Sequence, residues 1–325
     1  MMSKHSILVA LSGSEQSRNA AELAWFIAEK IDATVTAEHI IDCRSVWELL
    51  RSDKPGFIGS GPYVQAYDQT MESMRSLSNQ LLSKYEAIAE GKKIEGKVIT
   101  KEGNPVELLA QDAKDYDLIV LGHAPSGLRA VDRDFNHYIR RSIAEGIAHE
   151  SPIPVLIVQS KPAVWQGMTI VSEMDHINIQ YIRSCLNLAL VLGLTPKLEF
   201  WATGVREEKP ASFKKDLLSE LPEAKGIDIE IDCFEGHAAV SRQDLFYENK
   251  AGEAGESFFA ETLFVLPTRD IGKKRITVLG TAPEDFIVSL TLPCLLLWPE
   301  DHKGFKLTEE RKNELITTNH KKQSK

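Results

Sequence analysis

The sequence has few cysteines, and none of them are paired. Its four cysteines stand far apart, and no two of them form a CxxC pair (Cys43, Cys185, Cys233 and Cys294). Isolated cysteines are typical of reduced thiols in a reducing compartment, whereas disulfide scaffolds and structural zinc sites use closely spaced ones. The spacing predicts a cytoplasmic protein without disulfides. It leaves open a zinc site built from distant cysteines and histidines, although no metal ligands can be assigned.

Long apolar runs and an excess of positive charge are also missing. No run approaches the roughly 20 apolar residues that span a bilayer, and the N-terminus MMSKHSILVALSGS lacks a signal-peptide pattern. The net charge of −9 and the pI of about 5.6 argue against a nucleic-acid surface. With 325 residues, 43% of them hydrophobic, the chain is long enough for two globular domains. We expect no membrane or nucleic-acid partner.

The stretch from Asp117 to Val158 indicates the fold. An apolar run ends at Gly122, as a buried parallel strand does. Helical spacing begins at Ser142, and a second apolar run follows two prolines at 155–158. Strand, glycine turn, helix and strand form a βαβ unit. Main-chain N–H groups in such a turn can face a phosphate.

The same alternation of apolar runs and helical periods fills both halves. In the first half we expect strands at 7–11, 34–41, 97–100, 117–121 and 155–158, and helices at 20–31, 63–90, 106–113 and 142–148. In the second half we expect strands at 170–174, 197–201, 227–234, 263–266 and 294–298, and helices at 180–192, 211–221 and 243–249. This order predicts an α/β protein with two doubly wound (Rossmann-like) five-stranded parallel-sheet domains in tandem, at 1–162 and 166–300, and a polar tail at 301–325.

The last helix of the second half is placed by spacing. Gly280 stands 13 residues before Pro293, as Arg141 stands 13 residues before Pro154, and each proline opens an apolar strand. The comparison predicts that the last helix begins at Gly280-Thr281.

Several segments resemble the universal stress protein family. They are ILVALSGSEQS, EGNPVELLAQDAKDYDLIVLG and SIAEGIAHESPIPVLIV in the first half, and Asp175 with 272–297 in the second. The resemblance covers about residues 5–160 and 168–298, and implies a tandem member with two copies of the domain. Family dimers pair through the last strand, so it also implies an internal pseudo-dimer in which 155–158 and 295–298 face each other across a two-fold.

The family's ATP-binding motif is incomplete in the first half. ATP-binding members carry G-x-x-G, nine residues, then G-[S/T], with an Asp after the first strand. Here Gly122 and Ser142 are kept, but Pro125 and Arg141 replace the second and third glycines and Ser12 replaces the Asp. Fifteen residues stand where the motif has nine. A proline removes a main-chain donor, so this half is expected to bind a small anion through arginine, or nothing.

In the second half, Pro267 and Asp270 replace the first two glycines, whereas Asp175, Gly280 and Thr281 are kept. We therefore expect adenosine contacts, if there are any, in this half. The candidate cofactor-binding residues of both halves are Ser12, Gly122, Gly127, Arg141, Ser142, Asp175, Gly280 and Thr281.

Each candidate also has an ordinary structural interpretation. The glycines can simply make tight turns, and Ser142 and Thr281 are good helix N-caps. The arginines at 129–141 can be a solvated face instead of an anion clamp. His123 has no identifiable nucleophile partner, so no catalytic residue is assigned.

The resemblance implies a stress-response protein that needs no cofactor and catalyses no reaction, with ATP, AMP or a small anion as a weakly bound ligand. An alternative is a non-nucleotide scaffold, an internal pseudo-dimer or a homodimer, that docks an unknown protein partner. A third interpretation is a regulator that binds and hydrolyses ATP, for which no base or metal-binding carboxylate pair can be placed.

Overall fold

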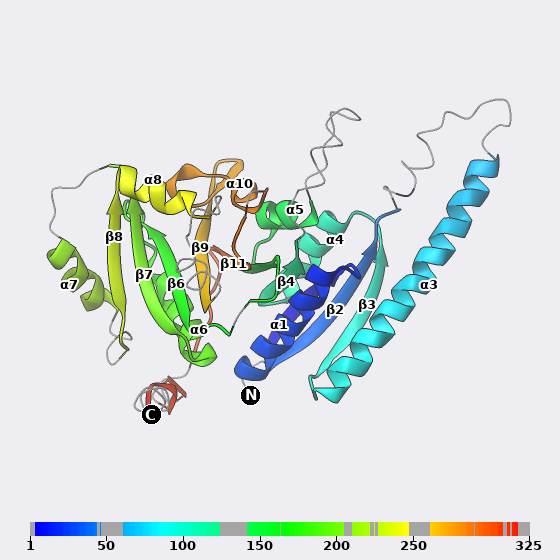
Figure 1. The fold of residues 1–325 in the computed structure, drawn as a ribbon, viewed down its shortest axis with the longest axis horizontal. Helices are drawn as coiled ribbons and strands as arrows, with labels where there is room; N and C mark the ends of the chain where they lie inside the picture. Colours follow the sequence, from blue (N-terminus) through cyan, green and yellow to red (C-terminus); the bar gives the residue numbers. More distant parts are fainter. Residues whose placement is uncertain are drawn as a thin grey trace. The chain divides into compact units, whose positions relative to one another are not determined.

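A computed structural model of the chain describes residues 4–43, 46, 61–123, 142–162, 164–204, 210–221, 224, 227–246, 261–288, 290–307, 311–312 and 314–317. The chain divides into two compact units, 1–122 and 123–325 (Figure 1). Most of the segment at 42–62, between the strand expected at 34–41 and the helix expected at 63–90, lies outside the described residues, as does the arginine-containing segment at 124–141. Each unit is described by itself.

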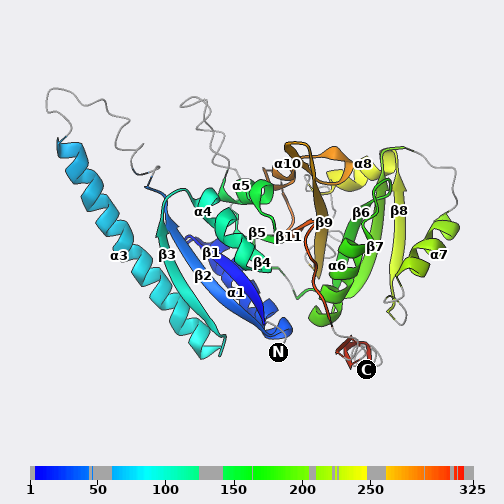
Figure 2. The same ribbon diagram turned by 180° about the vertical axis from the view of Figure 1, so that it is seen from behind.

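The first unit is a parallel sheet in the order β3-β2-β1-β4 (Figure 2). Its strands are β1 (His5–Leu11), β2 (Ala33–Ile41), β3 (Gly96–Glu102) and β4 (Leu118–Gly122). The central strand β1 pairs in parallel with both β2 and β4. Its apolar run at 7–9 is fully buried, as expected of a strand that is covered on both faces.

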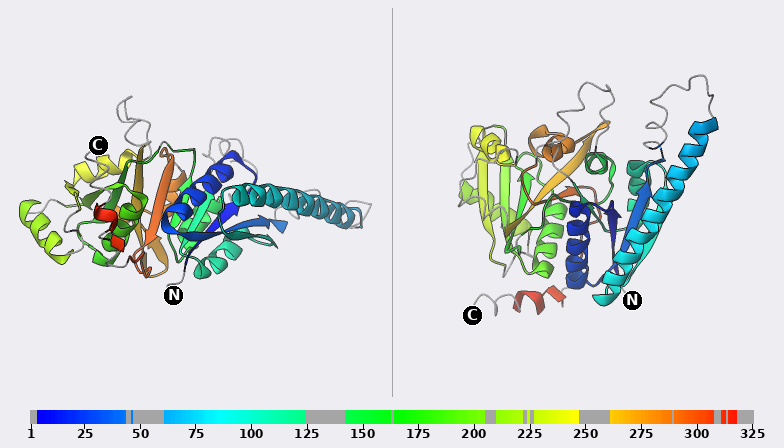
Figure 3. Two further views of the ribbon diagram at one scale, coloured as in Figure 1. Left: turned by 90° about the horizontal axis from the view of Figure 1, so that it is seen from below. Right: turned by 45° about the vertical axis from the view of Figure 1, so that its right-hand side comes forward.

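The described helices of the first unit start within a few residues of the predicted positions, the first at Glu15 instead of 20 and the second at Gly61 instead of 63. They are α1 (Glu15–Ile31), α3 (Gly61–Gly91) and α4 (Pro105–Asp112), followed by a short 3-10 turn η1 (Ala113–Asp115). Ser14 caps α1, and Asn104 caps α4 with Pro105 at its first position. α1 and α3 lie on one face of the sheet and α4 lies on the other (Figure 3).

The second unit contains strands in the order β5-β11-β9-β6-β7-β8, with β10 beside β9. Their bounds are β5 (Val155–Val158), β6 (Gly167–Glu173), β7 (Thr195–Ala202), β8 (Glu230–Glu235), β9 (Thr262–Ile271), β10 (Lys274–Ile276) and β11 (Cys294–Pro299). The pairs among β6, β7, β8, β9 and β11 are parallel. This confirms the predicted parallel α/β class.

The predicted meeting of the two last strands is confirmed. β5 pairs antiparallel with β11, with Leu156 opposite Leu296 and Val158 opposite Cys294. The side chains of both strands are almost fully buried. An antiparallel pair has a local two-fold axis, which is the symmetry that the resemblance implied.

Two element predictions in the second unit are wrong. The helices are α5 (Ile143–Glu150), α6 (Ile179–Leu192), α7 (Pro210–Glu220), α8 (His237–Asp244) and α10 (Pro283–Val288). The helix expected at 243–249 is α8, which starts at His237 because Gly236, with φ of 52°, turns the chain directly after β8. The helix expected from Gly280 starts at Pro283, after a short 3-10 turn η5 (Val278–Gly280).

The boundary predicted between the two sequence repeats, at 162–166, stays a prediction. The compact units instead part at Gly122. Because β5 is paired with β11 and α5 packs against α10, the last helix and strand of the first repeat belong to the second unit.

The first unit buries the carboxylate of Glu38, on β2, which is only 1% exposed. Lys101 Nζ, from β3, lies 3.5 Å from Glu38 Oε1 and also pairs with Asp112 of α4. Two carboxylates therefore share one ammonium group. Burial, together with the neighbouring Asp112 carboxylate, raises the pKa of Glu38 from 4.5 to about 7.

This pKa has a consequence for stability. A carboxyl whose pKa is higher in the folded state adds stability below pH 4.5 and loses it as the pH rises through about 7. The loss for Glu38 is on the order of 3 kcal/mol, since one pKa unit corresponds to about 1.4 kcal/mol. We expect Glu38→Gln to raise the thermal midpoint relative to wild type at pH 8 but not at pH 4.5. Glu86→Gln, at an exposed position of α3, is the control. Equal differences at both pH values would contradict the prediction.

Candidate functional site

Ligands of doubly wound sheets bind at the carboxyl ends of the strands, where the strand order reverses. In the first unit this point lies between β1 and β4, and in the second it lies between β6 and β9. We call these two places the first and the second crevice.

Three serine hydroxyls gather at the first crevice. Ser12, directly after β1, donates its N–H to Ser17 Oγ at 2.9 Å, and its hydroxyl lies 3.0 Å from that of Ser14. Ser14 Oγ in turn accepts the N–H of Ser17 at 3.1 Å. Ser12 and Ser14 are exposed at the N-terminus of the 17-residue helix α1. The predicted site residue Ser12 thus lies in the place that the fold assigns to it.

Gly122 has a packing role that its place in the motif did not predict. A Cβ atom added to Gly122 would lie 2.4 Å from the main-chain carbon of Gln16 and 2.4 Å from the nitrogen of Ser17. The first turn of α1 therefore rests directly on the end of β4, and a side chain at this position would push it away. Glycine permits a close main-chain approach at this position, and it is the main chain of α1 that approaches.

The remaining candidates of the first half are only partly described. Gly127 and Arg141 lie outside the described residues. Ser142 is the predicted N-cap: its hydroxyl accepts the N–H of Glu145 at 3.2 Å, while the Glu145 carboxylate accepts the N–H of Ser142 at 3.3 Å. This reciprocal capping box satisfies two donors at the start of α5.

In the second crevice the corresponding position of the helix carries a tyrosine. Tyr181 stands three residues after the N-cap Asn178, as Ser17 stands three residues after the N-cap Ser14. The Tyr181 hydroxyl lies 2.8 Å from Val171 O on β6 and 3.2 Å from Val265 O on β9. The side chain is 1% exposed, and burial raises the pKa of the phenol well above 10. The gap between β6 and β9 is therefore filled by a phenol that binds the backbone of both strands.

The segment that aligns with the family's phosphate loop is a β-hairpin. β9 runs on to Ile271, turns at Gly272-Lys273 and returns as β10, with Asp270 opposite Arg275. Arg275 donates to both carboxylate oxygens of Asp270, at 2.9 and 3.2 Å, and also to the carbonyl of Ser151. These hydrogen bonds hold the pKa of Asp270 below its usual range. The residues between Asp270 and Gly280 thus include the turn and the second strand of an antiparallel pair.

The other candidates of the second half do not form a helix-terminal site. Asp175 is exposed in the turn after β6, and Gly280 is exposed with φ of 77°. The prediction that Thr281 caps a helix is wrong: its hydroxyl donates to Val278 O at 3.2 Å and accepts from Gln243 of α8 at 3.0 Å. Its carbonyl accepts from Thr277. These contacts hold the Thr277–Thr281 loop in place.

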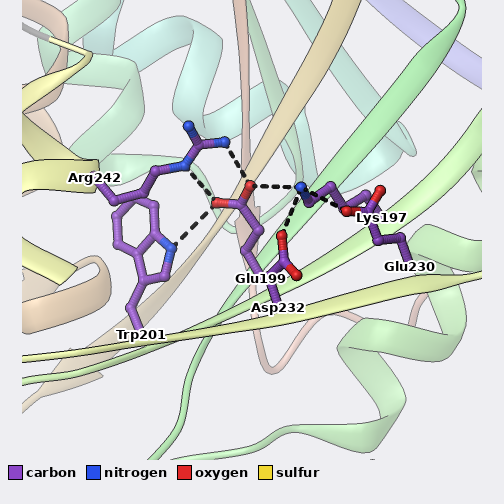
Figure 4. A network of polar contacts seen from close by, with 6 residues as sticks. All are labelled: Lys197, Glu199, Trp201, Glu230, Asp232 and Arg242. Carbon is purple, nitrogen blue, oxygen red and sulfur yellow. Dashed lines mark hydrogen bonds and ion pairs between the residues drawn. The ribbon is translucent and has the colours of Figure 1, made fainter. Parts of the chain in front are cut away.

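A buried charge network that sequence reasoning missed lies beside the second crevice (Figure 4). Glu199 of β7 is 0% exposed, and its carboxylate accepts two hydrogen bonds from Arg242 of α8, at 2.9 and 2.5 Å, and one from Trp201 at 3.3 Å. Lys197 Nζ lies 3.8 Å from the same carboxylate. Lys197 also pairs with two acids of β8, Glu230 at 3.2 Å and Asp232 at 2.7 Å. Charged residues within a strand, at 197 and 199, were the available signal.

An aromatic cluster fills the space next to this network. The Phe246 ring, which is fully buried, makes edge contacts with Trp201, Phe264 and Phe286, at centroid distances of 5.8, 5.1 and 5.9 Å. Within the described part of the chain, no three histidine, cysteine or acidic side chains are grouped to hold a metal ion. None of the helices described is long and apolar enough to cross a bilayer.

Comparison with known proteins agrees with this fold. A model of the universal stress protein family matches residues 4–159. A protein of Staphylococcus saprophyticus named as a universal stress protein is 30% identical over 167 residues, which cover 50% of this chain and 87% of the relative. The crystal structure of a universal stress protein from Archaeoglobus fulgidus superposes with a TM-score of 0.57 at 16% identity, and covers 90% of this chain and 96% of that one. A similar protein from Pseudomonas aeruginosa has a TM-score of 0.51 at 11% identity, with 98% of both chains covered.

The contact at Gly122 gives a prediction. Gly122→Ala should destabilise the protein by about 1–3 kcal/mol, because the new methyl group would displace the first turn of α1. Gly91→Ala is the matched control, since no atom lies within 4 Å of a Cβ at that position. Thermal unfolding should show a lower midpoint for the first variant alone, and equal midpoints would show that α1 does not rest on β4.

The Glu199 network gives a second prediction. Arg242→Met leaves a buried carboxylate without its main partner, which should cost about 3 kcal/mol. Adding Glu199→Leu removes the unpaired charge and should recover part of the lost stability. Arg18→Met, in an exposed pair 4.0 Å from Glu15, is the control and should have little effect. A double variant that is less stable than Arg242→Met would contradict this explanation.

Proposed function

The chain belongs to the universal stress protein family, and from that premise we propose that it is a non-catalytic stress-response protein whose two repeats have different tasks. The second repeat provides a permanent pairing partner for the first. The first repeat carries the polar crevice at which a small ligand would bind. The observation that supports this division most directly is the filling of the second crevice by Tyr181.

Ligand binding in the second repeat would have to break several contacts. A nucleotide between β6 and β9 would displace a buried phenol that is hydrogen-bonded to the carbonyls of Val171 and Val265. A phosphate loop is replaced there by a hairpin whose Asp270 is paired with Arg275. Breaking buried hydrogen bonds costs about 1–3 kcal/mol for each group left unsatisfied. The adenosine contacts predicted for Asp175, Gly280 and Thr281 remain untested, and these observations weigh against them.

A second candidate function, weak binding of an adenine nucleotide or a small anion, is favoured in the first repeat. Ser17 stands where the second repeat has Tyr181, so no ring fills the space between β1 and β4 at that position. Three hydroxyl groups there lie at the positive end of the α1 dipole. Gly122, Gly127, Arg141 and Ser142 are the further contacts that we propose for such a ligand.

The proposal includes no reaction and no required cofactor. A hydrolase would need a base and a metal-binding pair of carboxylates near a phosphate. Of the carboxylates described near the second crevice, Glu199, Asp270 and Glu173 are paired with Arg242, Arg275 and Arg269. Because β11 is paired with β5 on one side and with β9 on the other, a scaffold role would use surfaces other than its edges.

Calorimetric titration of the full chain with ATP, and separately with AMP, tests this assignment. We expect at most one weak site per chain, with an affinity that falls in Arg141→Ala and at raised salt, because exposed charge contacts are screened. Gly280→Arg should leave the affinity unchanged. Two sites per chain, or an affinity abolished by Gly280→Arg, would assign the ligand to the second repeat. Thermal unfolding of each variant checks that it is folded.

A further inference from the structure

Residues 299–307, which we call the strap, continue from β11 along α6 instead of leaving the domain. Asn178, the N-cap of α6, donates its side-chain N–H to Glu300 O at 3.1 Å. Asn187, two turns further along, donates to Phe305 O at 3.0 Å. The two ends of the strap are therefore held by the same helix.

The strap lies on side chains of α6 and of its N-cap, which we call the seat (Asn178, Gln180, Ser184 and Asn187). The seat binds main-chain groups of the strap. Gln180, Ser184 and Asn187 are spaced as neighbours on one side of a helix. Asn178 and Asn187 each donate a hydrogen bond to a carbonyl of the strap. These two contacts therefore recognise the main chain of the strap and not its side chains. The Glu300 side chain adds an ion pair with His176 at 3.1 Å.

One position of the strap admits only glycine. Gly304 has φ of 82°, and a Cβ there would lie 2.1 Å from Ser184 Oγ and 2.9 Å from Gln180 Nε2. Ser184 is fully buried and cannot move aside freely. The next side chain, Phe305, is 8% exposed, so the aromatic ring is packed against the protein. The seat thus fits a segment that begins with a turn and contains a glycine followed by an aromatic residue.

We propose that the seat is a peptide-binding surface, occupied in cis by the strap of the same chain and open to the strap of a second copy when the cis strap leaves. The recognition groups are all side chains of α6 and its N-cap, so they do not depend on whether strap and seat belong to one chain. Covalent linkage gives the cis strap an effective concentration of about millimolar, which keeps the second copy out while the cis strap fits. Exchange would join two chains through identical contacts, as domain swapping does.

The test uses the full-length chain. Gly304→Val places a β-branched side chain at positive φ against Ser184, and should release the strap. Lys306→Ala, at an exposed position of the same strap, is the matched control. Hydrogen exchange at 299–307 should become at least tenfold faster in Gly304→Val alone. A fluorescent peptide with the sequence PEDHKGFKL should then bind Gly304→Val at least tenfold more tightly than wild type.

A peptide with valine in place of its glycine is the specificity control and should not bind. The proposal is overturned if the strap of Gly304→Val stays protected, if the native peptide fails to bind the released seat, or if the valine peptide binds equally well. Should Gly304→Val not unfold cooperatively, Asn187→Ala replaces it. That variant removes the contact to Phe305 O, so it should speed exchange of the strap and weaken peptide binding. An unchanged strap in Asn187→Ala counts against the seat.

Discussion

Both units depend on a contact at the carboxyl ends of their central strands, where the first turn of a helix packs against the sheet. In the first unit, α1 rests on β4, which requires Gly122. In the second unit, Pro267 stands at the corresponding position, and the Tyr181 ring bridges β6 and β9. Two repeats with one topology therefore differ in what fills the same gap, a serine hydroxyl in one and a phenol in the other.

The pairing of β5 with β11 has a similarly wide effect. Both strands are apolar along their whole length, and fully burying one such side chain contributes about 1.5–3 kcal/mol. Unpaired strand edges of this composition would be prone to association with other chains. Because β5 and β11 pair with each other, each strand satisfies main-chain groups of the other along this edge.

Much of the fold could be predicted from the sequence, since apolar runs, N-caps and prolines are local signals. Ser142 caps a helix as predicted, and Ser14 and Asn104 cap two further helices directly after strands. The hairpin of β9 and β10 could not be predicted from the sequence. Its residues are largely charged and its second strand has only three residues, so it leaves no apolar run. The alignment of Gly280 with Arg141, based on the distance to the next proline, placed the start of α10 three residues too early. The buried charges of Glu38 and Glu199 were missed because their partners, Lys101 and Arg242, lie some 60 and 40 residues away and no local pattern links them.

The site residues were the least predictable part, because a motif records residue types and not what approaches them. Gly122 was predicted as a ligand contact, and what the structure shows at this position is the close approach of the first turn of α1. The Glu199 network suggests why the second crevice stays closed. Buried ion pairs seldom add much stability over apolar packing, but they fix orientation when every oxygen has a partner. Arg242, held by two hydrogen bonds to Glu199, fixes α8, and the adjacent Gln243 holds Thr281. The Thr277–Thr281 loop is thus fixed by the protein's own side chains.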